Sequence, residues 1–352
     1  MKLSTPQNPA SGSVVNTASL AERLGLSRWT VSRVLNDQPG VKEETRKRVL
    51  AAVEASGFKP NLQARRLRGL PTKLVGISFQ ELEAPVLALK SSEIQKQLKE
   101  RGYRGLFELA GGDPSVERDV IQHFISIGVD GIVLMGSKLQ EEDEIFVRLN
   151  EQGIAIVTAD AREGLSVPKV EVDRANAMEQ VVEHLYGYGH RKFGLLGIGS
   201  DDMYLQRRVS GLKRAIKKRG LSWESDVIEI SMQGRDIQSP YYGQDLAKEL
   251  LKKDTLPTAL ISLNDRISMG VSKTLKEAGI KIPEDVSIIG FDNLEECNWL
   301  TPALSSVDQN VGDLMKASAD ILLKVMERKK VPSITKIQPI LNPRKSTATF
   351  KK

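Results

Sequence analysis

The chain has 352 residues, of which 40% are hydrophobic and 27% are charged, as is typical of globular proteins with about two domains. This composition excludes a wholly disordered chain and a collagen-like one, and no apolar run approaches the roughly 18 residues of a membrane span. One cysteine, Cys297, excludes an intrachain disulfide framework, and the polar stretch Met1–Ser13 does not have the pattern of a secretory signal. We therefore expect a cytoplasmic protein.

The net charge of +6 is unevenly distributed. Residues 1–70 hold 12 basic and 5 acidic residues, whereas the remainder holds 39 basic and 40 acidic residues. A basic segment attached to a nearly neutral body favours a polyanionic partner for that segment. The alternative is an ordinary solvated basic face.

The first 73 residues divide into three parts. Residues 1–14 are rich in Ser, Pro and Asn and are predicted to be a disordered extension. Residues 15–58 contain three short helical patterns. Residues 59–73 include Pro60 and Pro71 and are predicted to be a linker.

The first two helical patterns are joined by a glycine turn. Either Asn16 or Ser19 can cap the first helix, Ser19 forms a capping box with Glu22, and Gly25 ends the helix. Ser27 caps a second helix that runs to Leu35. Two helices joined in this way predict a helix-turn-helix, whose second helix enters the major groove of DNA.

The second helix has one apolar and one polar side. Helical spacing turns its valines inward and places Arg28 with Ser32, and Trp29 with Arg33, on the outer side. Arginine can bond guanine O6 and N7 together, which suits this side to reading bases. The alternatives are an ordinary surface hairpin and a Trp29 that packs within the small domain.

A third helix and the linker complete the predicted DNA-binding part. The third helix, about 44–56, is expected to close the small core through Val49, Leu50 and Val53.

The linker segment 61–68 could form two helical turns, which are marginal alone in water. Its arginines would repel one another unless phosphates are present, so we expect it to fold on DNA. The alternative is a flexible charged linker.

Leu67, which is set among these arginines, is predicted to be an apolar wedge that enters the minor groove and kinks the duplex. The alternative is that it packs on the body of the protein.

From residue 74 onward, short apolar runs alternate with helical stretches that often end in glycine. This pattern predicts an α/β fold with doubly wound parallel sheets, and its length favours two lobes. The expected strands are Leu74–Phe79, Gly131–Met135, Ile154–Thr158, Phe193–Gly197, Val227–Ile230, Ala259–Leu263 and Val286–Phe291.

Polar side chains follow several of these strands. Asp160, Asn264 and Asp292 each come directly after an expected strand, and Arg208 lies early in a helix after another. Ligands of open α/β sheets bind beyond the carboxyl ends of the strands. These four side chains are therefore candidates for binding the hydroxyls of a small molecule. For any one of them, a helix cap or a surface ion pair is the alternative.

The sequence resembles the lactose-repressor (LacI/GalR) family of bacterial transcription regulators nearly from end to end. The resemblance is carried by motifs in the small domain, the linker and the body: LAERLGLS (20–27), TVSRVLN (30–36), PGV (39–41), EETR (43–46), GF (57–58), PN (60–61), GHRK (189–192), RVSGL (208–212), ND (264–265), PEDVSIIGFD (283–292) and TPAL (301–304). Lys42 departs from the family, which usually has a capping Ser or Thr there.

The resemblance implies a homodimer that binds a pseudo-palindromic operator in double-stranded DNA through a helix-turn-helix domain. Arg28, Trp29 and Arg33 match base-reading positions, Asn36 and Asn61 match backbone-contacting ones, and Leu67 matches the wedge. The full set expected at DNA is Ser27, Arg28, Trp29, Thr30, Ser32, Arg33, Asn36, Asn61, Ala64, Arg65 and Leu67.

The body, 74–350, resembles the periplasmic-binding-protein-like core of the family, in which ligand is held between two lobes. We expect lobe 1 at about 74–173 and 304–331, and lobe 2 at about 174–303 and 332–350. Asp160, Arg208, Asn264 and Asp292 match effector-contacting positions. A sugar or sugar derivative is expected, with a nucleobase or an acid as alternatives.

The aromatic side chain that would stack on this effector is left open. The segment 234–243 is about two residues longer than usual, and either Tyr241 or Tyr242 could serve.

The residues do not favour an enzyme. None of the three histidines, His123, His184 and His190, lies in a catalytic or metal-ligand spacing, and we expect no metal and no cofactor. Cys297 is expected to be a buried thiol, and His190 to be structural.

The leading hypothesis is an effector-responsive transcriptional repressor of carbohydrate-related genes. A soluble sugar-binding protein with a vestigial DNA-binding domain is the alternative. The operator sequence, the effector, and whether the effector releases or promotes DNA binding stay open.

Overall fold

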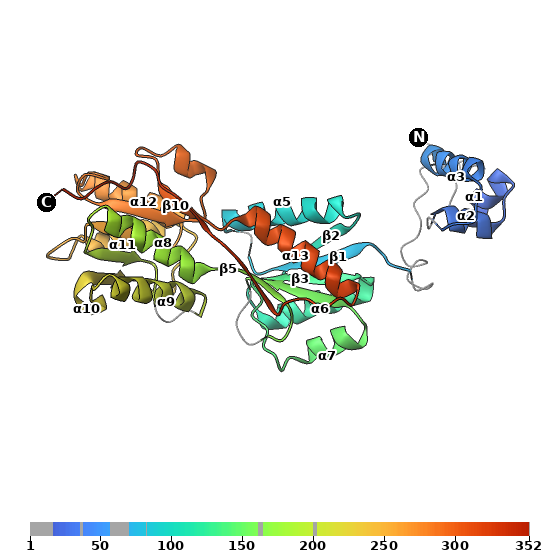
Figure 1. Ribbon diagram of the computed structural model, residues 1–352, viewed down its shortest axis with the longest axis horizontal. Helices are drawn as coiled ribbons and strands as arrows, with labels where there is room; N and C mark the ends of the chain where they lie inside the picture. Colours follow the sequence, from blue (N-terminus) through green and yellow to red (C-terminus); the bar gives the residue numbers. More distant parts are fainter. Residues whose placement is uncertain are drawn as a thin grey trace, which may run out of the picture. The chain divides into compact units, whose positions relative to one another are not determined.

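A computed structural model describes residues 17–35, 38–56, 70–81, 83–160, 165–199 and 203–351, and the chain divides into two compact units at Thr72. The first unit is helical (Figure 1), with helices α1 (Thr17–Leu24), α2 (Arg28–Leu35) and α3 (Glu43–Ser56). A positive φ of 64° at Gly25 makes the turn between α1 and α2, which is a backbone conformation that glycine adopts readily.

The small unit has one apolar core. Its fully buried side chains are Leu20, Ala21, Val31, Val34 and Val49, which come from all three helices. The expected inward position of Leu50 is wrong, because 49% of this residue is exposed. Leu50 lies about 100° around α3 from Val49, and in this helix that rotation carries its side chain away from the core that Val49 enters.

The second unit contains two six-stranded sheets with helices on both faces, as the sequence pattern predicted (Figure 1). The first sheet, in lobe 1, is parallel throughout and has the strand order β11-β5-β4-β3-β1-β2. Its strands are β1 (Leu74–Phe79), β2 (Arg104–Leu109), β3 (Gly131–Met135), β4 (Ala155–Ala159), β5 (Lys169–Val172) and β11 (Ile334–Ile337).

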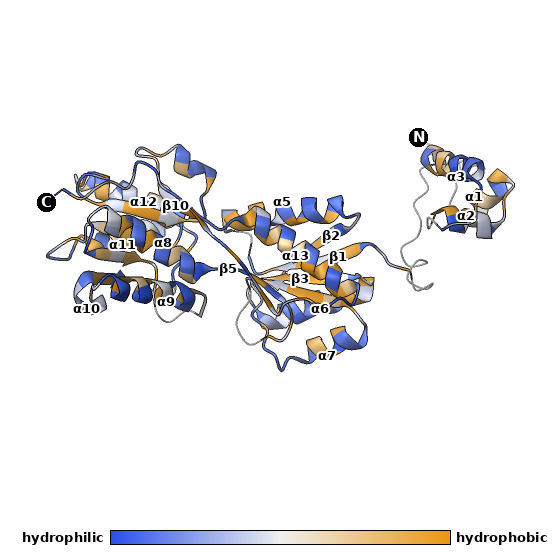
Figure 2. Cartoon of the chain, in the orientation of Figure 1, coloured by the Kyte–Doolittle hydropathy of each residue, from blue (hydrophilic) through white to orange (hydrophobic). Residues whose placement is uncertain are grey.

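Helices α5 (Pro85–Glu100) and α13 (Val311–Met326) cover one face of this sheet, and α6 (Pro114–Ile127) and α7 (Glu144–Glu151) cover the other. The hydropathy colouring in Figure 2 places the apolar residues of lobe 1 on the inner strands, such as β1 and β3. A sheet buried on both faces has continuous apolar strands, which is why these two strands were recognisable from the sequence.

The second sheet, in lobe 2, has the order β12-β10-β9-β8-β6-β7, in which only β12 is antiparallel. Its strands are β6 (Phe193–Leu196), β7 (Val227–Ile230), β8 (Ala259–Ser262), β9 (Ser287–Phe291), β10 (Ser305–Asp308) and β12 (Ile340–Asn342). Its helices are α8 (Arg174–Gly187), α9 (Met203–Lys218), α10 (Trp223–Asp226), α11 (Pro240–Leu250), α12 (Asp265–Glu277) and the short 3-10 helix η1 (Glu295–Asn298).

The chain passes between the lobes three times, and the later two crossings differ from the expected boundaries. Strand β10 pairs with β9 in lobe 2, and β11 pairs with β5 in lobe 1. The crossings therefore lie after Asp308 and after Ile337, instead of near residues 304 and 331. Both strands have only four residues, and neither sequence indicates which sheet it joins.

Two further expectations concern single residues. Cys297 is fully buried, as expected. His190 is also buried, and its ring nitrogens lie 3.0 Å from the hydroxyls of Thr258 and Ser287, which is the structural role expected for it. None of the described helices is both long and apolar enough to cross a membrane.

Candidate functional site

Helix α2 begins at a side-chain cap. The backbone N–H of Thr30 donates to Ser27 Oγ at 3.0 Å, and the two hydroxyl oxygens lie 2.8 Å apart. The cap satisfies an N–H group that the first turn of a helix leaves without a partner. Ser27 and Thr30, two of the residues predicted to meet DNA, therefore also fix where the helix starts.

The outer side of α2 exposes Arg28 and Trp29, and 62% of Trp29 is accessible to solvent. The alternative that Trp29 packs within the small unit is therefore wrong. The central carbon of the Arg33 guanidinium lies 4.6 Å from the centroid of the Trp29 ring. An exposed indole under a guanidinium forms a flat, cationic surface of the kind that meets nucleic acid.

Arg33 is also bound to the loop that follows α2. Its Nε donates to the Pro39 carbonyl at 2.8 Å, and its Nη2 donates to the same oxygen. The guanidinium is half-buried and packs beside Gly40. Its direction is thus fixed by the protein, and two of its five N–H groups are already occupied.

Ser32, the remaining predicted contact on α2, is half-buried. Five other predicted DNA contacts lie outside the described residues: Asn36, Asn61, Ala64, Arg65 and Leu67.

In the second unit, Asp160 follows β4 directly and has a φ of 55°, which is uncommon for a residue other than glycine. Its carboxylate accepts hydrogen bonds from Lys90 Nζ at 2.6 Å and Arg174 Nη1 at 2.8 Å, and from the Val172 N–H at 3.1 Å. Burial favours the neutral acid, but the charges of Arg174 and Lys90 outweigh it and hold the pKa of Asp160 far below its usual range.

Asp292 occupies the corresponding position in lobe 2, directly after β9, with a φ of 110°. Its Oδ1 accepts a hydrogen bond from Gln309 Nε2 at 2.5 Å. Burial raises the pKa of Asp292, although the charges of Arg208, Lys90 and Arg174 oppose the shift. Lys90 lies on α5 of lobe 1, and Arg174 begins α8, where the chain enters lobe 2. The charges of both act on Asp292, so polar groups of the two lobes influence one another here.

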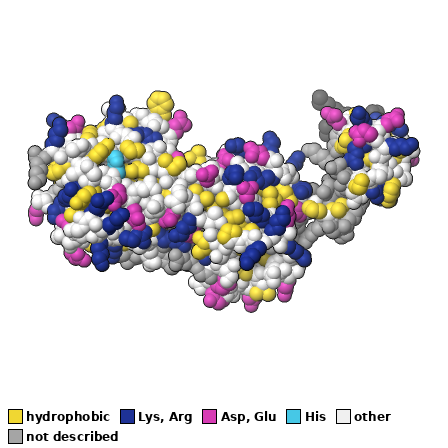
Figure 3. Space-filling view, in the orientation of Figure 1, with side chains coloured by type: hydrophobic (Ala, Val, Ile, Leu, Met, Phe, Trp, Pro, Cys, Tyr) yellow, Lys and Arg dark blue, Asp and Glu magenta, His cyan; other side chains and the backbone are white. Residues whose placement is uncertain are grey.

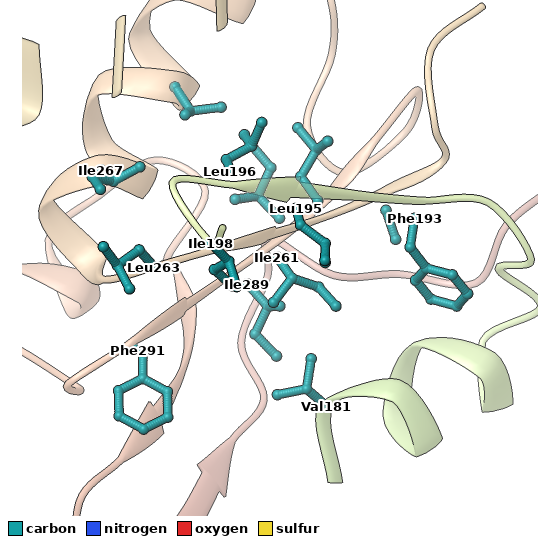
Figure 4. Close-up of a cluster of buried hydrophobic side chains, with 14 of the residues drawn as sticks. Val181, Phe193, Leu195, Leu196, Ile198, Ile261, Leu263, Ile267, Ile289 and Phe291 are labelled. Atoms are coloured by element: carbon teal, nitrogen blue, oxygen red, sulfur yellow. The ribbon is translucent and has the colours of Figure 1, made fainter. Parts of the chain in front are cut away.

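Arg208 is buried against the last residue of the same strand. Its guanidinium carbon lies 3.8 Å from the centroid of the Phe291 ring, and its Nη1 donates to the Leu263 carbonyl at 2.5 Å. Figure 4 shows Phe291 and Leu263 at one end of the apolar cluster of lobe 2, with Phe193 at the other. Arg208 thus lies early in α9, as the sequence predicted, and its guanidinium reaches the carboxyl ends of β8 and β9.

The side chain of Asn264 caps α12. Its Oδ1 accepts from the Ile267 N–H at 2.9 Å, and its Nδ2 donates to the Ile237 carbonyl at 2.8 Å. The capping role that the sequence left as an alternative is thus present. These two bonds leave one lone pair on Oδ1, and the second N–H of Nδ2 faces Gln238 Oε1 at 3.5 Å.

The two tyrosines considered as stacking residues are placed differently. Tyr242 is buried, and its hydroxyl lies between the N–H and the carbonyl of Met232 in the core of lobe 2. Tyr241 is 74% exposed at the start of α11. Of the two, only Tyr241 presents its ring to solvent.

Sequence reasoning missed Lys90 and Arg174, although both left a signal. Lys90 shares one side of α5 with Ile94 and Leu98 at a spacing of four residues, so it is a cation within an apolar stripe. Arg174 follows the buried strand β5 by two residues, at the start of α8. The described residues contain no group of three or more His, Cys, Asp or Glu placed to hold a metal ion.

Comparisons with known families match two parts of the chain. Residues 19–61 match the family described as bacterial regulatory proteins, lacI family. Residues 182–347 match the family described as the periplasmic binding protein-like domain.

The chain is also similar to curated regulators over nearly its whole length. It is 28% identical to the HTH-type transcriptional regulator MalR of Streptomyces coelicolor, over 87% of this chain and 89% of the relative. It is 28% identical to catabolite control protein A of Priestia megaterium, over 91% and 95%. It is 27% identical to the HTH-type transcriptional repressor PurR of Pasteurella multocida, over 93% and 97%.

Among solved structures, the fold matches that of the lac repressor dimer bound to operator and the anti-inducer ONPF. The TM-score is 0.83 at 22% identity, over 95% of this chain and 99% of the other. The transcription regulator CcpA of Lactococcus lactis matches with a TM-score of 0.66 at 25% identity, over 78% of this chain and 98% of the other.

Proposed function

Because this chain belongs to the lacI family of bacterial regulatory proteins, with a helix-turn-helix domain and an effector-binding domain, we propose that it is a transcriptional repressor that binds a pseudo-palindromic operator as a homodimer. A small molecule bound between the lobes controls its affinity for that operator. The protein acts in the cytoplasm and catalyses no reaction.

The outer side of α2 is the observation that carries the proposal. Arg28 and Trp29 are exposed there, and Arg33 is held in a fixed direction beside them. Base-edge contacts from this side would select the sequence, and contacts to phosphates would supply most of the salt-dependent affinity. A homodimer would set two such helices about one turn of DNA apart, so the operator would contain an inverted repeat.

The effector cleft is proposed at the carboxyl ends of the inner strands. Asp160 belongs to lobe 1, whereas Arg208, Asn264 and Asp292 belong to lobe 2. A ligand that contacts both lobes would favour one relative angle of the lobes over others. Coupling of this kind between two sites amounts to about 1–3 kcal/mol.

The experiment that tests this function is capture of genomic DNA fragments by the purified full chain, with and without candidate effectors. The proposal predicts that the bound fragments share an inverted repeat and that at least one effector changes their recovery. A solute-binding protein with a vestigial DNA-binding domain would bind a ligand but enrich no sequence.

A further inference from the structure

At the carboxyl ends of β4 and β5, where the chain passes from lobe 1 to lobe 2, one buried carboxylate lies between two buried cations. Asp160 contacts Lys90 Nζ at 2.6 Å and Arg174 Nη1 at 2.8 Å. The exposed fractions of the three side chains are 7% for Lys90, 9% for Asp160 and 11% for Arg174. These three residues, which we call the cation pair and its bridging acid, carry a formal charge of +1.

The neighbouring acids of the described chain are engaged elsewhere. Glu171 lies 2.5 Å from Arg207, with which it forms its own ion pair. Asp292 accepts from Gln309 at 2.5 Å and lies within the electrostatic influence of Arg208, Lys90 and Arg174. Among the described residues, Lys90 and Arg174 therefore share one directly bonded acid, Asp160, while Asp292 and Glu171 contribute a smaller favourable charge at Arg174. A buried charge is stable only when it is compensated.

The cation pair also has donors in excess. Within the described residues, Lys90 donates one hydrogen bond and Arg174 donates one, both to Asp160. An ammonium group has three N–H donors and a guanidinium group has five, so most of these donors remain for another acceptor. The oxygens of Asp160, in contrast, already accept three hydrogen bonds, which leaves little capacity for the hydroxyls of a neutral sugar.

Charged side chains that are exposed to solvent are in a different environment. On the face seen in Figure 3, basic and acidic side chains alternate over the surface of the protein. Exposed charges of this kind are compensated by water and by salt. The surplus at Lys90 and Arg174 differs because it lies inside the protein.

We propose that the effector carries an anionic group, a carboxylate or a phosphate, and that Lys90 and Arg174 bind this group beside Asp160. The inference rests on the proposed effector role of the cleft and narrows the effector from sugars in general to acidic or phosphorylated ones. A bound anion would compensate the charge of the second cation. It would also accept hydrogen bonds from the N–H groups of Lys90 and Arg174 that do not bond to Asp160. The guanidinium would contribute planar, two-point recognition, and the ammonium a point charge.

The test measures thermal unfolding of the full chain as inorganic phosphate or acetate replaces chloride at constant ionic strength. We expect a saturable rise in the melting temperature of residues 73–352 with at least one of the two anions. Lys90→Met should weaken the apparent affinity at least tenfold, and Arg174→Lys should weaken it less because the charge is kept. The control is Lys96→Met in the same helix, whose side chain is 62% exposed and whose loss should change nothing.

The ligand-free variants add a second measurement. Lys90→Met leaves Arg174 and Asp160 as a neutral pair, so its melting temperature without anion should equal or exceed that of the wild type. The relative effect of phosphate and acetate identifies which anionic group the site prefers.

The proposal is overturned if neither anion gives a saturable shift, or if Lys90→Met responds as the wild type does. If the protein then still selects an operator, only the anionic effector is excluded. If it selects no DNA sequence either, the proposed function fails as well.

Discussion

The guanidinium of Arg33 lies over the indole ring of Trp29, one turn earlier in α2. It also donates a hydrogen bond to the carbonyl of Pro39, which lies in the loop after α2. The Trp29 ring is exposed, so this contact contributes little to the core of the small unit. Its effect is to fix the direction of two side chains on the outer side of α2. Side chains that are ordered before binding lose less conformational entropy on binding.

This arrangement makes Arg28 and Arg33 distinguishable by mutation. Arg28→Ala should weaken specific DNA binding by about 1–3 kcal/mol and leave the stability of the small unit unchanged, because Arg28 is exposed. Arg33→Ala should weaken binding by a similar amount and also destabilise the small unit by about 1 kcal/mol, because the bond to Pro39 is lost. Fluorescence anisotropy with labelled duplexes measures binding, and thermal unfolding measures stability. An Arg33→Ala variant with intact operator discrimination would contradict the docking of α2.

Asp160 should be essential for the stability of the second unit. Asp160→Asn leaves Lys90 and Arg174 buried without their acid, so we expect a loss of about 3–5 kcal/mol in the free energy of unfolding. Urea unfolding measures it, and the exposed Asp119→Asn, which should stay within about 0.5 kcal/mol of the wild type, is the control. Equal stability of the two variants would show that Asp160 does not compensate the cations.

Asp265 should make stability depend on pH. Burial, with a smaller contribution from Asp292, raises the pKa of Asp265 to about 7, whereas an unfolded aspartate has a pKa of about 3.9. Between these values the folded state holds a proton that the unfolded state releases, so the contribution of Asp265 to stability falls as pH rises from about 4 to 7.

Asp265→Asn has no such proton. Urea unfolding at several pH values should therefore show the stability of the wild type, measured relative to the variant, decreasing as pH rises across that range. Parallel pH profiles of the two proteins would show that Asp265 titrates normally.

Gly270 lets two helices of lobe 2 approach closely. A Cβ at this position of α12 would overlap the Pro240 carbonyl oxygen at the start of α11. Gly270→Ala should therefore destabilise lobe 2 by about 1–3 kcal/mol, the usual cost of overpacking. The matched control is Gly312→Ala in α13, where a Cβ meets no atom within 4 Å and the change should be neutral or stabilise by up to about 1 kcal/mol. Thermal unfolding compares them, and an equal loss in both would contradict the packing argument.

The sequence alone was sufficient to predict the strands that have a clear run of apolar residues. The inner strands β1 and β3 were predicted with the bounds that the structure has, because β3 is apolar throughout and Ser78 is the one polar residue of β1. The polar residues Asp160 and Asp292 were found by the same logic, since each ends such a strand. The outer strand β2 was missed because its partly exposed sequence RGLFEL lacks this signal.

Contacts between distant parts of the chain could not be predicted in this way. The bond from Arg33 to Pro39 depends on the path of a loop, and the ion pair of Lys90 with Asp160 joins residues that are 70 positions apart. A lysine in the apolar side of α5 signals a buried partner, but its spacing does not identify that partner. The sequence position of Asn264, between a strand and a helix, was equally compatible with a helix cap and with a ligand contact.

The central claim is that the outer side of α2 selects a DNA sequence. The most direct test is the ratio of affinities of the purified full chain for its best captured duplex and for random duplex, at one salt concentration, with and without small molecules. The account predicts a preference of about 1,000-fold or more in at least one condition, reduced by Arg28→Ala. Equal affinity for both duplexes under every condition would contradict it.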